Sequence, residues 1–352
     1  MKKIVFIFSL ISILFPITVL AEEEFTNYIM RDMDSGRVFL EKASNVKKLP
    51  ASTTKVMTAI VGIENSNLSD VVTVGDEILT MDGTNVYLEV GENILMQDLL
   101  YGLILRSVND ASMVIAKHAG GSVQNFVKLM NEKARSLGLT NTIFNNPSGL
   151  DDNEKNYSTV SDLSLIYSYA YKNRTFRDIV STESYKTESD KKSYYFKNRM
   201  EMLNMYDKCT GGKTGYTPDA GRLLISSASN NDLDLVMVSI GNDYGYNFHI
   251  NNFEEVFSKY KNYKILDKDN FKVDSTLNGK LYINNSFSYP LTNEELSKVS
   301  KKVIFNSNKK GVVGEVLIYL DDELIHKEDV YLRLYENSFW DKLVNFFKNL
   351  TW

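Results

Sequence analysis

The sequence predicts an α+β fold, in which helices and antiparallel strands pack together in layers. Two observations support this prediction. Between about residues 25 and 262, helix-like runs mix with neighbouring strand-like runs that are joined by turn residues. From about residue 263 onward, the sequence changes to short β-rich runs between polar turns, which indicates a separate, smaller β domain. The 352 residues are enough for a large core and two domains.

Within the first region, strands are predicted where β-rich runs flank turn residues, and helices where apolar residues recur at helical spacing. The strand pairs are residues 28–30 with 38–40, around Asp34-Ser35-Gly36, and residues 223–227 with 233–240, around Asn230-Asn231-Asp232. One helix is predicted directly after Ser52, a second over residues 99–105 and a third over residues 111–118. In the second region we expect strands over 272–273, 280–283 and 302–305, and a hairpin of 312–320 with 323–325.

Both ends of the chain differ from these regions. Residues 1–21 combine Lys2 and Lys3 with an apolar run and the small-residue site Val19-Leu20-Ala21, so we expect a secretory signal peptide; the alternative is an uncleaved anchor. Residues 336–352 predict a helix with aromatic and aliphatic side chains on one face and polar ones on the other. We expect this helix to lie in a membrane interface, and the alternative is packing on the protein's own core.

Charge and cysteine content argue against several kinds of function. The 40 basic and 45 acidic residues are balanced, so we expect no nucleic-acid binding. The one cysteine, Cys209, cannot form an internal disulfide, and a small buried residue is expected there rather than a nucleophile. His118, His249 and His326 lie far apart and form no spaced metal signature, so we predict no metal and no other cofactor.

Three short motifs stand in order along the first region: Ser52-Thr53-Thr54-Lys55, Ser107-Val108-Asn109 and Lys213-Thr214-Gly215. On a helix, residues at i and i+3 share a face, so the Ser52 hydroxyl and the Lys55 amine can meet. A serine is a poor nucleophile until a base takes its proton. Lysine can be that base only if burial or nearby positive charge lowers its pKa, and Lys213 can supply such charge.

Each motif is weak by itself. The Ser-x-x-Lys spacing occurs five times, but only Ser52 follows Pro50-Ala51 and precedes an amphipathic helix; an N-cap serine is the alternative. The second motif lies between two apolar helices, where its hydroxyl can relay a proton and its amide can hold a peptide group, unless it is only a capping turn. The third is expected on a strand edge, where it can bind a carboxylate, unless it is an ordinary glycine-rich start of a strand.

Together the motifs resemble those of the penicillin-binding proteins and, more narrowly, the D-alanyl-D-alanine carboxypeptidases. The resemblance covers residues 25–262 and includes the longer segments 50–59, 98–103, 107–111, 146–150 and 212–217. It implies a β-lactamase/transpeptidase-like domain, an antiparallel sheet with helices on both faces. The expected organisation is a signal peptide (1–21), a serine DD-peptidase domain (22–262), a small β domain (263–335) and an amphipathic membrane-association helix (336–352). The chain departs from the family at Val108, where glycine is common, and at residues 242–249, which lack an arginine that many relatives carry.

The resemblance implies a catalytic cycle on a peptidoglycan stem peptide that ends in D-Ala-D-Ala. Ser52 would attack the carbonyl between the two D-alanines, Lys55 would accept its proton, and Ser107 would pass a proton to the leaving D-alanine. Water would then hydrolyse the acyl-enzyme, whereas β-lactam antibiotics would acylate the serine and remain there.

The resemblance also implies how the substrate is held. Asn109 would orient the substrate amide, and Lys213 and Thr214, followed by Gly215, would hold the terminal carboxylate. The backbone N–H groups of the nucleophile and of Tyr216 would hold the oxyanion. The expected location is the extracytoplasmic face of the bacterial cytoplasmic membrane or the cell wall.

Three alternatives stay open at this point. A β-lactamase of class A deacylates with a glutamate, and no Glu-x-x-Leu-Asn segment lies between Asn109 and Lys213. An endopeptidase or transpeptidase would use the same site with a different acceptor. A non-catalytic peptidoglycan-binding protein of the envelope would not need the intact motif residues.

Overall fold

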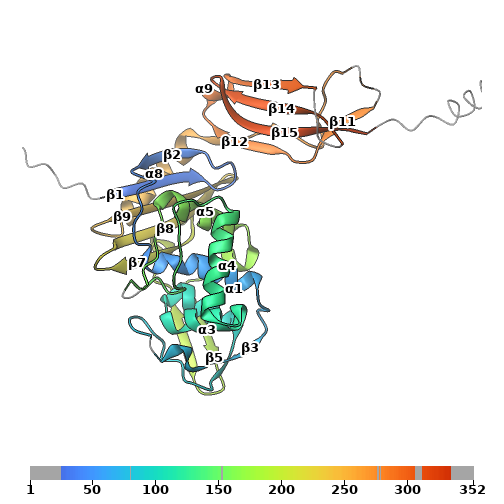
Figure 1. The fold of residues 1–352 in the computed structure, drawn as a ribbon. Helices are drawn as coiled ribbons and strands as arrows, with labels where there is room; N and C mark the ends of the chain where they lie inside the picture. The colour runs from blue at the N-terminus through green and yellow to red at the C-terminus, as the bar shows by residue number, and fades with distance from the viewer. Residues whose placement is uncertain are drawn as a thin grey trace, which may run out of the picture.

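The computed structural model describes residues 25–79, 81–151, 154–275, 277, 279–305 and 311–333. The predicted signal peptide and the predicted C-terminal helix therefore lie outside the described residues. Figure 1 shows a body of helices and strands, coloured blue to yellow, followed by a smaller β region in orange and red. The α+β fold and the separate all-β region predicted from the sequence are confirmed.

The body is built on a five-stranded antiparallel sheet with the order β2-β1-β9-β8-β7. Successive side chains of a strand point to opposite faces, and here both faces are buried: Val236 and Val238 of β9 lie in one core, Leu235 and Met237 in the other. Both predicted strand pairs are found, in β1 with β2 and in β8 with β9. The strands are β1 (Phe25–Asp32), β2 (Val38–Lys42), β7 (Cys209–Thr217), β8 (Gly221–Asn230) and β9 (Leu233–Gly241).

Helices cover both faces of this sheet, as the sequence predicts. Val56 of α1 and Ile166 of α5 belong to the larger core on one face, while Met202 of α7 and Phe253 of α8 belong to the core on the other. The helices of the body are α1 (Lys55–Glu64), α2 (Met96–Tyr101), α3 (Asn109–Gly120), α4 (Val123–Ser136), α5 (Val160–Tyr171), α6 (Arg174–Val180), α7 (Met202–Met205) and α8 (Tyr246–Lys259), with 3₁₀ turns η1 (Ala51–Thr54) and η2 (Asp76–Ile78) and a π-helical turn η3 (Gly102–Arg106). Two small hairpins pair β3 (Val71–Thr73) with β4 (Asn93–Leu95) and β5 (Ser184–Glu188) with β6 (Ser193–Lys197).

The β region has its own core, which includes Leu281, Val316 and Val330. Its four-stranded sheet has the order β11-β15-β14-β13, and β10 pairs with β12 in a second sheet. The elements are β10 (Lys261–Leu266), β11 (Lys280–Ile283), β12 (Phe287–Leu291), α9 (Asn293–Leu296), β13 (Val299–Ile304), β14 (Val312–Leu320) and β15 (Glu323–Arg333). The strand predicted at 272–273 is wrong, because that two-residue run has no pairing partner. Strand β10 spans the boundary expected between residues 262 and 263.

Arg37, at the turn before β2, connects the body to the β region. Its guanidinium donates to the Pro290 carbonyl at 2.6 Å and forms an ion pair with Glu295 of α9. The same guanidinium lies over the rings of Tyr260 and Tyr289, at 4.9 and 5.3 Å from their centroids. A half-buried bidentate pair between a guanidinium and a carboxylate, flanked by rings, fixes the orientation of its two partners.

No helix within the described ranges combines the length and the apolar character that crossing a bilayer requires.

Candidate active site

The first motif forms a direct contact between serine and lysine. Lys55 Nζ donates to Ser52 Oγ at 3.0 Å, to Asn109 Oδ1 at 2.8 Å and to the Ser148 carbonyl at 2.6 Å. Among the described residues, this is the one Ser-x-x-Lys pair whose amine contacts the serine hydroxyl. Neither η1 nor α1 has a side-chain cap, so the alternative of Ser52 as an N-cap is wrong.

Ser52 lies in a turn with an unusual backbone. Ala51 has a φ of 44°, which is a rare conformation for a residue with a side chain, and η1 then leads directly into α1. Strained residues of this kind gather at functional sites, where the surrounding structure holds them. The turn also packs closely on β7: a Cβ added to Gly215 would lie 3.3 Å from the Ser52 nitrogen. The missing side chain of Gly215 therefore lets the backbone of the Ser52 turn approach β7 closely.

The second motif is held by the loop of residues 82–88. The Asn109 N–H donates to the Thr84 carbonyl at 2.7 Å, and Asn109 Nδ2 donates to the Asp82 carbonyl at 2.7 Å. Ser107 has a left-handed φ of 62° between η3 and α3, so the predicted loop between two helices is found. Val108, at the family's common glycine position, is fully buried in the core.

The third motif lies on β7, the edge strand of the sheet, as predicted. Lys213 is 2% exposed, and its Nζ donates to Ser107 Oγ at 2.9 Å and to the Thr214 carbonyl at 2.8 Å. The lysine thus points inward, to the second motif's serine. Two Ser–Lys contacts therefore lie side by side, and Asn109 touches the first of them.

The two lysines have strongly altered proton affinities. Burial, and then the positive charge of Arg199, lower the pKa of Lys55 to about 7. Burial, and then the charges of Lys55 and Arg199, hold the pKa of Lys213 well below its ordinary value. A lysine with a pKa near 7 is neutral for much of the time at neutral pH, as a proton acceptor must be.

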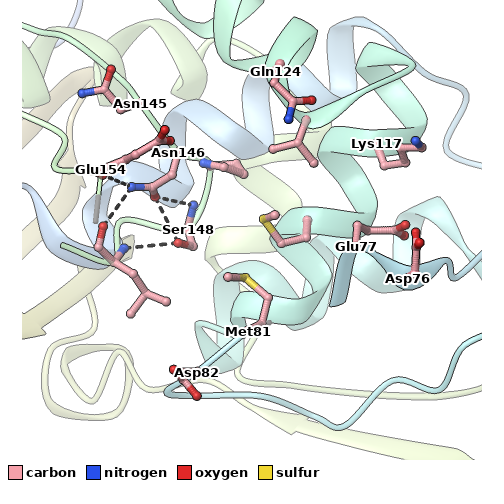
Figure 2. Close-up of a pocket in the computed structure, with 14 residues that line it drawn as sticks. Asp76, Glu77, Met81, Asp82, Lys117, Gln124, Asn145, Asn146, Ser148 and Glu154 are labelled. Atoms are coloured by element: carbon pink, nitrogen blue, oxygen red, sulfur yellow. Dashed lines mark hydrogen bonds between the residues drawn. The ribbon is translucent and has the colours of Figure 1, made fainter. Parts of the chain in front are cut away.

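Sequence reasoning missed two contributors to this site. Arg199 belongs to no motif; its backbone N–H donates to the Leu105 carbonyl at 3.0 Å, and this contact brings it to the cluster. The Ser148 carbonyl was also missed, although the segment 146–150 resembles a family loop. Asn146 Oδ1 accepts hydrogen bonds from the N–H groups of Ser148 and Gly149 and from Ser148 Oγ, which shapes this loop, as Figure 2 shows in part.

A pocket of about 600 Å³ opens beside the cluster. Figure 2 shows Asn146 and Ser148 on one wall and Asp76, Glu77 and Met81 on others. Ser148 belongs to the wall of this pocket and also gives its carbonyl to Lys55, so the pocket adjoins the serine–lysine pair.

Cys209 and His249, the other residues whose side chains could take part in catalysis, lie outside the serine–lysine cluster. Burial raises the pKa of the Cys209 thiol to about 11, so the thiol stays protonated and is no nucleophile at neutral pH. His249 lies in the core between the hydroxyls of Ser226 and Ser239, and burial lowers its pKa to about 3. Within the described part of the chain, no group of three or more His, Cys, Asp or Glu side chains is arranged to hold a metal ion.

The fold and the converging motifs are those of the serine-dependent proteins that recognise penicillin. The chain belongs to the D-alanyl-D-alanine carboxypeptidase family, whose model matches residues 19–244. It is 34% identical over 219 residues to D-alanyl-D-alanine carboxypeptidase DacF of Bacillus subtilis, covering 60% of this chain and 56% of that relative. It is 36% identical over 212 residues to DacB2 of Mycobacterium tuberculosis, covering 60% of this chain and 72% of that protein. The match with the Bacillus relative thus spans little more than half of its length.

Among solved structures, penicillin binding protein 5 from Haemophilus influenzae is similar over both parts of the chain. The TM-score is 0.76 at 26% sequence identity, and the match covers 88% of this chain and 97% of the other. This coverage extends the likeness in fold beyond the body to the β region.

Proposed function

We propose that the protein is a serine-type D-Ala-D-Ala carboxypeptidase that removes the terminal D-alanine from peptidoglycan stem peptides. The observation that carries this proposal is the 3.0 Å contact between Ser52 Oγ and a buried Lys55 with a pKa near 7. Membership of the D-alanyl-D-alanine carboxypeptidase family supports the choice of substrate.

Acylation begins with proton transfer from Ser52 to neutral Lys55, while the serine oxygen attacks the carbonyl between the two D-alanines. The negative charge that develops on the carbonyl oxygen is held by backbone N–H groups of Ser52 and Tyr216. Ser107, hydrogen-bonded to Lys213, passes a proton to the nitrogen of the leaving D-alanine, and the proton that Lys55 accepted restores the Ser107 hydroxyl through the hydrogen-bonded cluster. Water then attacks the ester carbon and frees Ser52.

Substrate binding uses the free edge of β7. An extended peptide can pair with the edge of β7 that has no neighbouring strand, between β7 and the Ser107–Asn109 loop. Asn109 Oδ1 accepts from Lys55, and Asn109 Nδ2 donates one N–H to the Asp82 carbonyl. The second N–H of Nδ2 and the second lone pair of Oδ1 are therefore the groups that can bind the substrate amide. Thr214 offers its hydroxyl on the same strand.

The direct test uses purified protein and an N-acylated peptide that ends in D-Ala-D-Ala. We expect release of one D-alanine per peptide, and a benzylpenicillin adduct that mass spectrometry locates on Ser52 and that persists for many turnover times. Rapid penicillin hydrolysis would instead identify a β-lactamase. Transfer of the acyl group to an added amine acceptor in preference to water would identify a transpeptidase. If the protein forms neither a product nor an adduct, it is a non-catalytic binding protein.

The rate of acylation is expected to rise as the pH rises through about 7, because only neutral Lys55 accepts the serine proton. Arg199→Gln removes a positive charge that lowers the Lys55 pKa, so the midpoint of this rise moves to higher pH. The measurement is the second-order rate of labelling by a fluorescent penicillin across pH. Arg174→Gln, which removes a charge on a side chain that is 87% exposed in α6, is the matched control and keeps the wild-type midpoint. An unmoved midpoint in Arg199→Gln contradicts this account of the Lys55 pKa.

We also propose that the protein is exported and works at the outer face of the bacterial cytoplasmic membrane, where residues 336–352 form an interfacial helix. The signal-peptide pattern of residues 1–21 and the aromatic face of the last residues support this. A chain that ends at residue 338 is expected to stay in solution when the full chain sediments with anionic vesicles, and to keep its kcat/KM on soluble peptide. Lost activity in the shortened chain would instead mean that these residues pack on the enzyme.

A further inference from the structure

One buried carboxylate beside the site has no part in the chemistry proposed above. Asp110, the residue after Asn109 at the start of α3, is 2% exposed. Its Oδ1 accepts from the Ala111 N–H at 2.9 Å, a contact that an acidic residue in the first turn of a helix commonly makes. Such a contact uses only one of the two oxygens. A buried carboxylate needs donors for both, so the partners of the second oxygen indicate what else the residue does.

The second oxygen of Asp110 binds the loop of residues 82–88. Asp110 Oδ2 accepts from the backbone N–H groups of Val86 and Leu88, each at 3.1 Å. The backbone N–H of Asp110 in turn donates to Asn85 Oδ1 at 3.1 Å. These hydrogen bonds, two of them to a charged acceptor, join the start of α3 to the loop.

The loop adopts an unfavourable backbone conformation where it meets Asp110. Tyr87, between the two N–H donors, has a φ of 59°, which is a genuine outlier for a bulky residue. Its side chain is 78% exposed, so packing of the ring does not hold this conformation. It is held by hydrogen bonds to the backbone instead, from Asp110 on one side and from Lys192, which donates to the Tyr87 carbonyl, on the other.

The same loop fixes the side chain of Asn109. Asn109 Nδ2 donates to the Asp82 carbonyl at 2.7 Å, and the Asn109 backbone N–H donates to the Thr84 carbonyl at 2.7 Å. Because Nδ2 is turned to the loop, Oδ1 faces Lys55 Nζ, from which it accepts at 2.8 Å. A loop that moved away would release Nδ2 and leave the amide free to rotate.

We propose that Asp110 is a positioning residue for acylation: it anchors the loop of residues 82–88, and the loop orients the Asn109 side chain that holds the substrate amide. This inference rests on the proposed function, in which Asn109 binds that amide. In the described part of the chain, Asp110 forms no hydrogen bond with Ser52 or Lys55, so it acts through Asn109.

The test compares benzylpenicillin with aminopenicillanic acid, the penicillin nucleus that keeps the β-lactam and the carboxylate but lacks the side-chain amide carbonyl. In the full-length protein, the ratio of their second-order acylation rates measures recognition of this amide. Asn109→Ala is expected to lower the ratio about tenfold. Asp110→Asn keeps the size of the side chain but leaves one acceptor oxygen for N–H groups on two sides. It is therefore expected to lower the ratio by about three- to tenfold.

A double-mutant cycle and a matched control accompany this comparison. In the Asn109→Ala background, Asp110→Asn is expected to change the ratio by less than about twofold, because the side chain that it positions is already absent. Asp98→Asn removes a carboxylate that is 1% exposed in α2 and keeps the wild-type ratio. Should Asp110→Asn not fold, Asn85→Ala removes the acceptor of the Asp110 N–H and is expected to lower the ratio in the same direction.

Two outcomes overturn the assignment. Equal slowing of both compounds in Asp110→Asn, with a wild-type ratio, would show a role in stability alone. A further fall of the ratio in the double variant, below that of Asn109→Ala, would show that Asp110 acts independently of Asn109. Failure of the proposed function is distinct, because wild-type protein would then form no adduct with either compound and would release no D-alanine.

Discussion

Replacing Ser52 with alanine is expected to abolish penicillin labelling and to lower kcat/KM for D-alanine release by at least about a thousandfold. The reason is that no other described hydroxyl combines contact with Lys55 and a place beside β7. Both quantities are measured on the same preparation, by gel fluorescence after labelling and by a coupled assay for free D-alanine.

The fold of Ser52→Ala is expected to survive, because Lys55 keeps its hydrogen bonds to Asn109 and to the Ser148 carbonyl. A melting temperature close to the wild-type value therefore accompanies the loss of activity. The matched control is Ser258→Ala, which removes an exposed serine with the same Ser-x-x-Lys spacing at the end of α8. Labelling that persists in Ser52→Ala would place the nucleophile elsewhere.

Gly149→Ala is expected to displace the nucleophile turn, destabilise the protein by more than about 3 kcal/mol and slow labelling more than about 100-fold. Gly149 has a φ of +84°, and an added Cβ would lie 1.9 Å from the Ala51 carbonyl oxygen. Because this overlap is with backbone, it can be relieved only by moving the residue before Ser52 or the loop whose Ser148 carbonyl binds Lys55. The measurements are urea unfolding and the rate of penicillin labelling.

Gly36→Ala is the control that separates the cost of the left-handed backbone conformation from the cost of the overlap with the Ala51 carbonyl. Gly36 has a similar φ of +76° but no atom within 4 Å of an added Cβ. It is expected to show the backbone cost alone, about 1–2 kcal/mol, with normal labelling by the folded protein. Equal effects of the two substitutions would mean that the contact between Gly149 and Ala51 does not position the nucleophile.

The sequence allowed the body and the motif residues to be predicted because their signals are local. A strand buried on both faces, such as β9, reads as a continuous apolar run, and the i, i+3 spacing of Ser52 and Lys55 fixes their contact. Strand β10 was not foreseen. It follows α8 after one residue, and it pairs with β12, which lies over twenty residues downstream.

Long-range contacts account for what the sequence did not predict in the site. Arg199 affects Lys55 although it lies 144 positions away in the chain, and the Ser148 carbonyl reaches Lys55 from a loop 93 positions away. The inward direction of Lys213 depends on Ser107, 106 positions earlier. Such neighbours depend on how the layers pack, and no short spacing in the sequence encodes them.

The contact between Arg37 and Glu295 has a mechanical consequence. It joins the β region to the turn before β2, the strand at one edge of the central sheet, whereas β7 and its motif form the opposite edge. Helix α8 ends at Lys259 and β10 starts at Lys261, so no flexible tether separates the two parts. The β region is therefore joined to one edge of the central sheet, and the Ser52 site lies at the opposite edge. Under the proposed function, the width of the sheet rather than a flexible linker sets the distance between the β region and the place where Ser52 meets its substrate.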